Sequence, residues 1–315
     1  MTARVEEMLL DRRLVFVTGK GGVGKTSVAA ALAELAARGG RRTLVCEMDA
    51  KGALADALGA SWLAFEPTEV EPGLFAMAMN TEDALREYLR LFVRVPLLGK
   101  IGPLARTFDF VADAAPGVKE ILAVGKLCHE VRERQYDLLV VDAEATGHIV
   151  AQIGAPQVIR KLVQVGMVRD QTDWMLDILH DPATTGVVIV TTPEEMPVTE
   201  TLDLLARLEP ETGVSPTAVV ANRVLEPWFD VGESGIVDAL DDHRAELVEV
   251  VGRGANAVVD AARIAEARRR IGEGHLARLH ESAPGMPVLT VPELFTRATG
   301  RRVVTQVADA LAAAR

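Results

Sequence analysis

The sequence predicts an α/β fold in which a doubly wound, mostly parallel sheet of about seven or eight strands carries helices on both faces. Seven short apolar runs alternate with helical stretches along the 315 residues, a pattern typical of a parallel sheet covered on both sides. A glycine-rich loop also stands between the first run and a helix, as it does in a phosphate-loop NTPase. The runs cover residues 13–18, 42–47, 74–79, 137–142, 186–191, 217–221 and 287–291.

The glycine-rich loop at residues 19–26 reads Gly-Lys-Gly-Gly-Val-Gly-Lys-Thr and satisfies the phosphate-binding-loop pattern. Such a loop needs glycine because its backbone turns sharply and directs several N–H groups at one anion. The positive N-terminal end of the helix that follows adds to the phosphate site. We expect the nucleotide to contact Gly19, Lys20, Gly21, Gly22, Val23, Gly24, Lys25, Thr26 and Ser27.

Nucleotide hydrolysis also needs a metal ion and a positioned water. We expect Lys25 to neutralise the β- and γ-phosphates and the hydroxyl of Thr26 to bind Mg²⁺. Residues 136–142 form a hydrophobic strand that ends in Asp142, which is a usual way to hold the outer shell of that ion.

Asp49 lies just beyond the strand predicted at residues 42–47. Because the carboxyl ends of parallel strands share the ligand edge of a sheet, we expect Asp49 and Asp142 to converge on the γ-phosphate and its metal. An equally good interpretation of the local sequence is that Asp49 caps the helix that begins near Gly52.

Composition limits the classes of partner. The net charge is −11, which argues against nucleic-acid binding because that depends on phosphate neutralisation. A basic stretch at residues 261–271 is the exception, and a solvated helix face explains it better than a DNA or lipid patch. No apolar run approaches the length of a membrane span, and the two cysteines are isolated. We therefore expect a cytoplasmic protein without an integral membrane segment or a thiolate metal site.

We predict one phosphate-loop domain over residues 1–315, interrupted by a helical subdomain at about 81–134 and a charged helical insertion at about 226–283. Thr81 is expected to cap the first helix of the subdomain. Apolar residues recur there at helical spacing, so this surface packs against the main domain or a second subunit, or forms a groove for a client protein. They are Leu85, Tyr88, Leu89, Phe92 and Val93, then Val118, Ile121, Leu122, Gly125 and Cys128.

These motifs resemble the arsenite-pump and tail-anchored-protein-targeting ATPase family, whose loop has the form Gly-Lys-Gly-Gly-x-Gly-Lys-Thr/Ser. Residues 47–59 look like the first switch of that family, and residues 141–148 look like its second switch. Residues 192–194, followed by Glu200 and Thr201, resemble its Pro-Glu…Glu-Thr segment. The resemblance covers most of the chain, from about residue 13 to residue 295.

The resemblance implies roles for individual residues. It implies that Lys20 reaches across a dimer interface to the partner's nucleotide, and that Asp49 orients the attacking water. Glu194 is expected to contact nucleotide across the same interface, Asn222 to read adenine and Pro292 to line the base. The implied protein is a dimeric switch that binds and hydrolyses ATP with Mg²⁺, and whose nucleotide state controls a client-binding helical subdomain.

Two departures leave other functions open. Glu144 and Ala145 lie in the second switch, and Ala145 stands where the family has proline, which relaxes the backbone there. One alternative is therefore a weakly active or inactive nucleotide-binding subunit, paired with a related ATPase in a heterodimer instead of a homodimer. A partitioning or positioning ATPase shares the loop with its early lysine and ranks lower, because the chain after Arg302 is short and carries little bulky apolar surface.

Overall fold

The computed structural model describes residues 9–49, 51–90, 117–163, 165–227 and 235–314. In these residues one eight-stranded sheet has the order β3-β4-β2-β5-β1-β6-β7-β8. All neighbouring strands are parallel except β3 and β4. The strands are β1 (Leu14–Gly19), β2 (Thr43–Glu47), β3 (Thr68–Glu71), β4 (Leu74–Ala78), β5 (Leu138–Ala145), β6 (Thr185–Thr191), β7 (Pro216–Val224) and β8 (Val288–Pro292). The predicted fold class is confirmed.

Each of the seven predicted runs forms a strand, and β3 is an eighth that the sequence did not predict. Its residues are Thr-Glu-Val-Glu, and they are exposed or only half-buried at the edge of the sheet. Charged side chains on an edge strand discourage pairing with another chain, so this strand lacks the apolar run by which buried strands are recognised. A tight turn at Gly73, with φ of 79°, joins β3 to β4.

Both faces of the sheet are buried, because successive residues of each strand point to opposite sides. In β1, Leu14 and Phe16 belong to one core cluster, while Val15 and Val17 belong to the other. The second cluster is covered by α2 (Lys25–Arg38), α3 (Ala53–Leu58) and α13 (Arg301–Ala313). The first is covered by α6 (Val118–Glu133), α7 (Thr146–Leu162), α8 (Met167–Leu179) and α9 (Glu195–Thr212).

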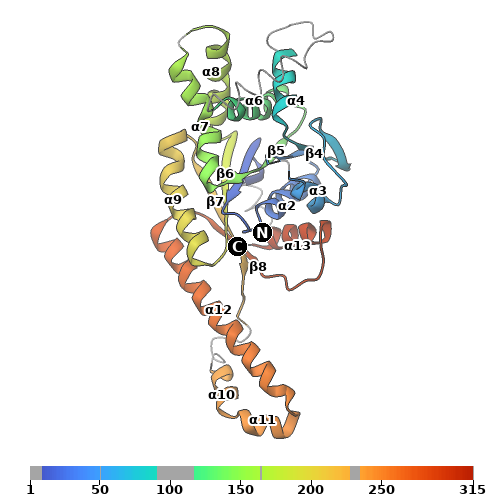
Figure 1. Cartoon of the computed structure of the whole chain (residues 1–315), viewed down its shortest axis with the longest axis vertical. Coiled ribbons are helices and arrows are strands. Elements are labelled where there is room, and N and C mark those ends of the chain that lie inside the picture. Colours follow the sequence, from blue (N-terminus) through green and yellow to red (C-terminus); the bar gives the residue numbers. More distant parts are fainter. Residues whose placement is uncertain (1–8, 50, 91–116, 164, 228–234, 315) are drawn as a thin grey trace.

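The predicted helical subdomain falls at one end of the molecule, where α4 (Thr81–Tyr88), α6 and α8 gather beyond the sheet (Figure 1). The cap prediction for Thr81 is wrong. Asn80 is the N-cap of α4, and its side-chain oxygen accepts the backbone N–H of Asp83 at 3.0 Å. Thr81 is instead the first residue inside the helix. Phe92 and Val93 lie outside the described residues.

The second insertion contains α10 (Ile236–Asp242), α11 (Arg244–Val251) and the long α12 (Gly254–Ser282). Figure 1 shows α12 extending away from the sheet, with α10 and α11 on its far end. The basic stretch lies on α12, where Arg269 and Arg270 both pair with Glu266 at 2.8 Å. Arg263, Arg268 and Arg270 are exposed, so most of this stretch faces solvent, and the absence of a DNA or lipid role stays a prediction. No helix in the described part of the chain is long and apolar enough to span a membrane.

Candidate nucleotide site

The loop between β1 and α2 depends on glycine at two positions. Gly19 has φ of 149°, and a Cβ atom there would lie 2.1 Å from the carbonyl oxygen of Val190. Gly24 has φ of 93°, and its Cβ atom would lie 2.4 Å from Nδ2 of Asn222. Gly24 is also the N-cap of α2 and makes no side-chain cap. The first N–H groups of α2 are therefore available to an anion, as a phosphate site requires.

Thr26 and Asp142 meet beside the loop. The hydroxyl of Thr26 donates a hydrogen bond to Oδ2 of Asp142 at 2.6 Å. Asp142 is buried within β5, which continues to Ala145 instead of ending at Asp142 as predicted, and its Oδ1 has no hydrogen-bond partner among the described residues. Burial raises the pKa of Asp142 from 3.8 to about 6, although Thr26 and Lys25 oppose this shift. Burial likewise lowers the pKa of Lys25, against the attraction of Asp142.

Glu47 adds a second buried carboxylate that the sequence analysis did not single out. It pairs in register with Asp142 across β2 and β5. Its Oε1 accepts the N–H groups of Ala53 at 2.8 Å and Leu54 at 3.3 Å, while its Oε2 is buried without a partner among the described residues. Unpaired oxygens of two neighbouring carboxylates, together with a hydroxyl, are donors that suit a hard cation such as Mg²⁺.

Asp49 lies at the exposed rim of this group. Its side chain is 56% exposed and forms an ion pair with Lys51. The alternative that Asp49 caps the next helix is wrong, because Gly52 is the N-cap of α3 and Glu47 accepts its first N–H groups. The charge of Asp49 still influences the pKa values of both Lys25 and Asp142. Its role with water or metal stays a prediction.

Lys20 forms an ion pair with Glu200 of α9. The second oxygen of Glu200 accepts a hydrogen bond from the hydroxyl of Thr146, the first residue of α7, at 2.8 Å. The bond from Lys20 is the main reason that the pKa of Glu200 lies below its ordinary value. The sequence placed Glu200 in a motif but did not predict its contact with Lys20, because nothing local connects two residues 180 positions apart.

Three more residues were predicted to contact the nucleotide: Asn222 and Pro292 at the base, and Glu194 across the interface. Asn222 is buried, and its Nδ2 donates to the carbonyl oxygen of Val23 at 2.8 Å. Glu194 is the exposed N-cap residue of α9, and Pro292 is the half-buried last residue of β8. A pocket of about 310 Å³ brings Glu194 together with the residues that follow Asn222 and Pro292. Its lining includes Glu194, Arg223, Glu293 and, from α12, Arg268 and His275.

The loop, the Thr26–Asp142 pair and the parallel sheet define the fold of a phosphate-loop NTPase. The model of the anion-transporting ATPase family matches residues 12–176 and 166–230 of this chain. The chain is 33% identical over 256 residues to the ATPase BagA of Mycobacterium tuberculosis, covering 75% of this chain and 73% of that protein. The chain therefore belongs to the anion-transporting ATPase family, which confirms the resemblance found in the sequence.

Two further relatives carry related names. A putative arsenical pump-driving ATPase of Halobacterium salinarum is 27% identical over 263 residues, covering 76% of this chain and 40% of that protein. The ATPase ASNA1 homolog 1 of Paramecium tetraurelia is 28% identical over 148 residues, covering 47% of this chain and 44% of that protein. ATP binding and ATPase activity are thus properties of the family to which the chain belongs.

Proposed function

We propose that this protein is a Mg²⁺-dependent ATPase that acts as a dimer, and that its nucleotide state controls the helical subdomain at about residues 81–134, where a hydrophobic protein client binds. The observation that carries the ATPase part is the bond between Thr26 and Asp142 beside the unpaired oxygens of Asp142 and Glu47. This arrangement supports a metal site next to the loop that contains Lys25.

In this proposal the loop N–H groups and Lys25 bind the phosphates of ATP, and Thr26 and Asp142 hold Mg²⁺. The ion would supply positive charge to the β- and γ-phosphates. Ionised Asp142 is costly while it is buried without a cation, as its raised pKa indicates. A bound cation offsets that cost, so the burial of Asp142 favours uptake of the metal with the nucleotide.

The contact between Lys20 and Glu200 supports the switch. If Lys20 reaches the partner's nucleotide, it must leave Glu200. Because Glu200 also accepts a bond from Thr146, that exchange alters the contact that holds the beginning of α7. α7 packs against α6 and α8, which belong to the helical end of the molecule. A change at the phosphate loop thus has a continuous path to the proposed client-binding subdomain.

The second switch bears on the alternative of a weakly active subunit. Ala145 has φ of −65° and ψ of 162°. A φ near −65° is the value at which proline is fixed, so alanine adopts the backbone conformation that the family's proline would impose. Alanine in place of proline makes the backbone of the second switch less rigid but keeps its conformation. This supports the interpretation that the protein retains ATP hydrolysis. Glu144 favours the alternative, because it places an extra carboxylate near the site, with Oε2 3.8 Å from Nδ1 of His148.

The test is an ATPase assay on the purified protein, combined with sedimentation velocity in the presence of ADP or a slowly hydrolysed ATP analogue. We expect Mg²⁺-dependent turnover and a dimer with the analogue. A monomer under both conditions would exclude the dimeric switch. Turnover that appears only after a related subunit is added would instead support the heterodimer. ATP-dependent binding to DNA or to liposomes would favour a partitioning or positioning ATPase.

A further inference from the structure

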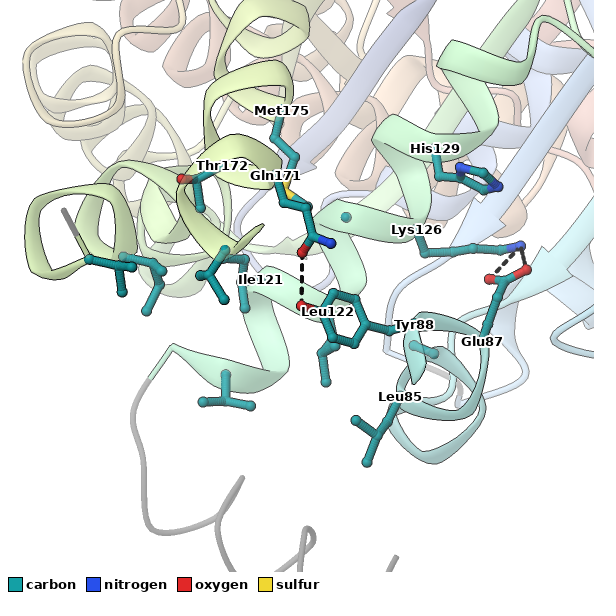
Figure 2. A pocket seen from close by; sticks show the side chains of 16 residues that line it. Leu85, Glu87, Tyr88, Ile121, Leu122, Lys126, His129, Gln171, Thr172 and Met175 are labelled. Atoms are coloured by element: carbon teal, nitrogen blue, oxygen red, sulfur yellow. Dashed lines mark hydrogen bonds and ion pairs between the residues drawn. The ribbon is translucent and has the colours of Figure 1, made fainter. Parts of the chain in front are cut away.

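A cavity of about 300 Å³ lies between α4, α6, α7 and α8, at the helical end of the molecule. Figure 2 shows Leu85, Tyr88, Ile121, Leu122 and Met175 around it. Most of its lining is aliphatic or aromatic, as in small-molecule sites that also carry a few well-placed polar groups.

One such polar group is Gln171 of α8. Its side chain is buried, with the residue 6% exposed, and its Oε1 accepts a hydrogen bond from the hydroxyl of Tyr88 at 2.8 Å. Its Nε2 is buried and has no hydrogen-bond partner among the described residues. A buried donor without a partner destabilises the folded protein, and an acceptor atom in the cavity would remove that cost.

The charges near the cavity are already paired. Lys126 binds Glu87 at 2.9 Å and Glu130 at 2.7 Å. Burial opposes the charge on Lys126, but its hydrogen bonds to Glu130 and Glu87 outweigh that effect and raise its pKa. The two carboxylates and one ammonium group leave one negative charge when all three are ionised. This charge disfavours an anionic ligand, so Lys126 does not mark a carboxylate-binding site.

The volume of the cavity lies in the range of small-molecule sites. At roughly 20–30 Å³ for each non-hydrogen atom, the cavity holds a molecule of about ten to fifteen such atoms. We propose that the cavity binds an uncharged, mostly apolar small molecule whose single acceptor oxygen takes a hydrogen bond from Nε2 of Gln171.

The experiment is titration calorimetry of the full chain, without nucleotide, using two probes with equal carbon count, 2-octanone and octanoate at pH 8. We expect saturable, submillimolar binding of 2-octanone and at least tenfold weaker binding of octanoate. The fluorescence of Trp174, which lies on α8 with Gln171, provides a second signal. Equal or tighter binding of octanoate, or no saturable binding of 2-octanone, would overturn the proposal.

Variants locate the binding site. Gln171→Leu replaces the amide with an apolar side chain of similar size and so removes the donor, and we expect about a fivefold or greater loss of 2-octanone affinity. Gln306→Leu on α13, an exposed position on the other face of the sheet, is the matched control and should bind as wild type does. Full affinity in Gln171→Leu would contradict the role of the amide.

Gly125→Leu should abolish binding by filling the cavity. A Cβ atom at Gly125 would lie 2.9 Å from Cε of Met175, the end of a flexible side chain that has room to move. Circular dichroism and thermal unfolding establish whether each variant folds, and the comparison of the two probes on wild type decides the question even if one variant does not. Because no nucleotide is present, failure here leaves the proposed ATPase switch untouched.

Discussion

Lys20 and Glu200 form an ion pair although they are 180 residues apart in the chain. The pair joins the phosphate loop to α9, and the second oxygen of Glu200 joins both to the first residue of α7. Three segments that border the candidate nucleotide site therefore meet at one carboxylate. Glu200 therefore holds Lys20, the residue that we propose to contact the nucleotide of the partner subunit.

Replacing Glu200 by Gln should release Lys20. Side chains exposed by 32% and 29% form a pair of modest strength, about 0.2–1 kcal/mol. We therefore expect the ATP analogue to induce dimers at a concentration roughly two- to fivefold lower than for wild type, as measured by sedimentation velocity. Glu209→Gln, an exposed position on the same helix, is the control and should behave as wild type. Weaker dimerisation in Glu200→Gln would show that Glu200 does not restrain Lys20.

The two loop lysines should separate binding from turnover. Lys25→Ala removes the charge next to the β- and γ-phosphates, so we expect turnover to fall by about a hundredfold or more and ATP affinity to fall with it. Lys20→Ala should impair hydrolysis while leaving ATP affinity largely intact. Equilibrium binding of a fluorescent ATP analogue and steady-state phosphate release measure the two effects. Unchanged turnover in Lys20→Ala would remove the proposed role across the interface.

The pKa of Asp142 predicts a stability effect that depends on pH and metal. The folded state binds the proton more tightly than the unfolded state, so between pH 3.8 and about 6 this group lowers the free energy of unfolding as pH rises. The full effect, roughly 3 kcal/mol, is present above pH 6. Mg²⁺ with ATP should reverse it, because the cation favours the ionised carboxylate.

Asp142→Asn tests this effect at pH 8. Without nucleotide the variant should be at least as stable as wild type in urea unfolding, whereas turnover should fall by about a hundredfold or more. Mg²⁺ with ATP should stabilise wild type and should stabilise the variant much less. If the variant is clearly less stable than wild type without nucleotide, then burial of the ionised Asp142 side chain does not destabilise the folded protein.

Gly24 and Asn222 should show coupled effects on ATP affinity. Gly24→Ala places a Cβ atom against Nδ2 of Asn222 and forces alanine to a φ of 93°, so we expect a large loss of ATP binding. Adding Asn222→Ala removes the clash but not the backbone strain, and should restore part of the loss. A double-mutant cycle on ATP affinity measures the coupling. Strictly additive losses would mean that the contact does not shape the loop.

The sequence predicted the features that follow from local pattern. Buried parallel strands are continuous apolar runs, so seven of them could be located, and Gly19, Gly24 and Thr26 lie where a strand–loop–helix order requires them. The strand β3 was missed because an exposed edge strand carries charge instead of an apolar run. Asn80 was missed as a cap because Asn and Thr are both good N-cap residues, and they are adjacent here.

The remaining features depend on tertiary placement. Glu47 becomes a site residue only because β2 lies directly beside β5, which the order of strands along the chain does not reveal. Glu200 meets Lys20 only after α9 packs over the sheet. Similarly, helical spacing predicted that Leu85 and Ile121 lie on apolar helix faces. It could not show that these helices enclose a cavity into which Gln171 brings an unpaired donor.

α7 extends from the candidate nucleotide site to the apolar cavity at the helical end of the molecule. It begins at Thr146, beside the phosphate loop, and its Ile159 lines the cavity near its other end. Seventeen helical residues span about 25 Å, so a tilt at one end displaces the other. Thermodynamic linkage makes such a connection symmetric: the factor by which ATP changes the affinity of the cavity for its ligand equals the factor by which that ligand changes the affinity for ATP. A small apolar molecule would then act as an effector of nucleotide binding.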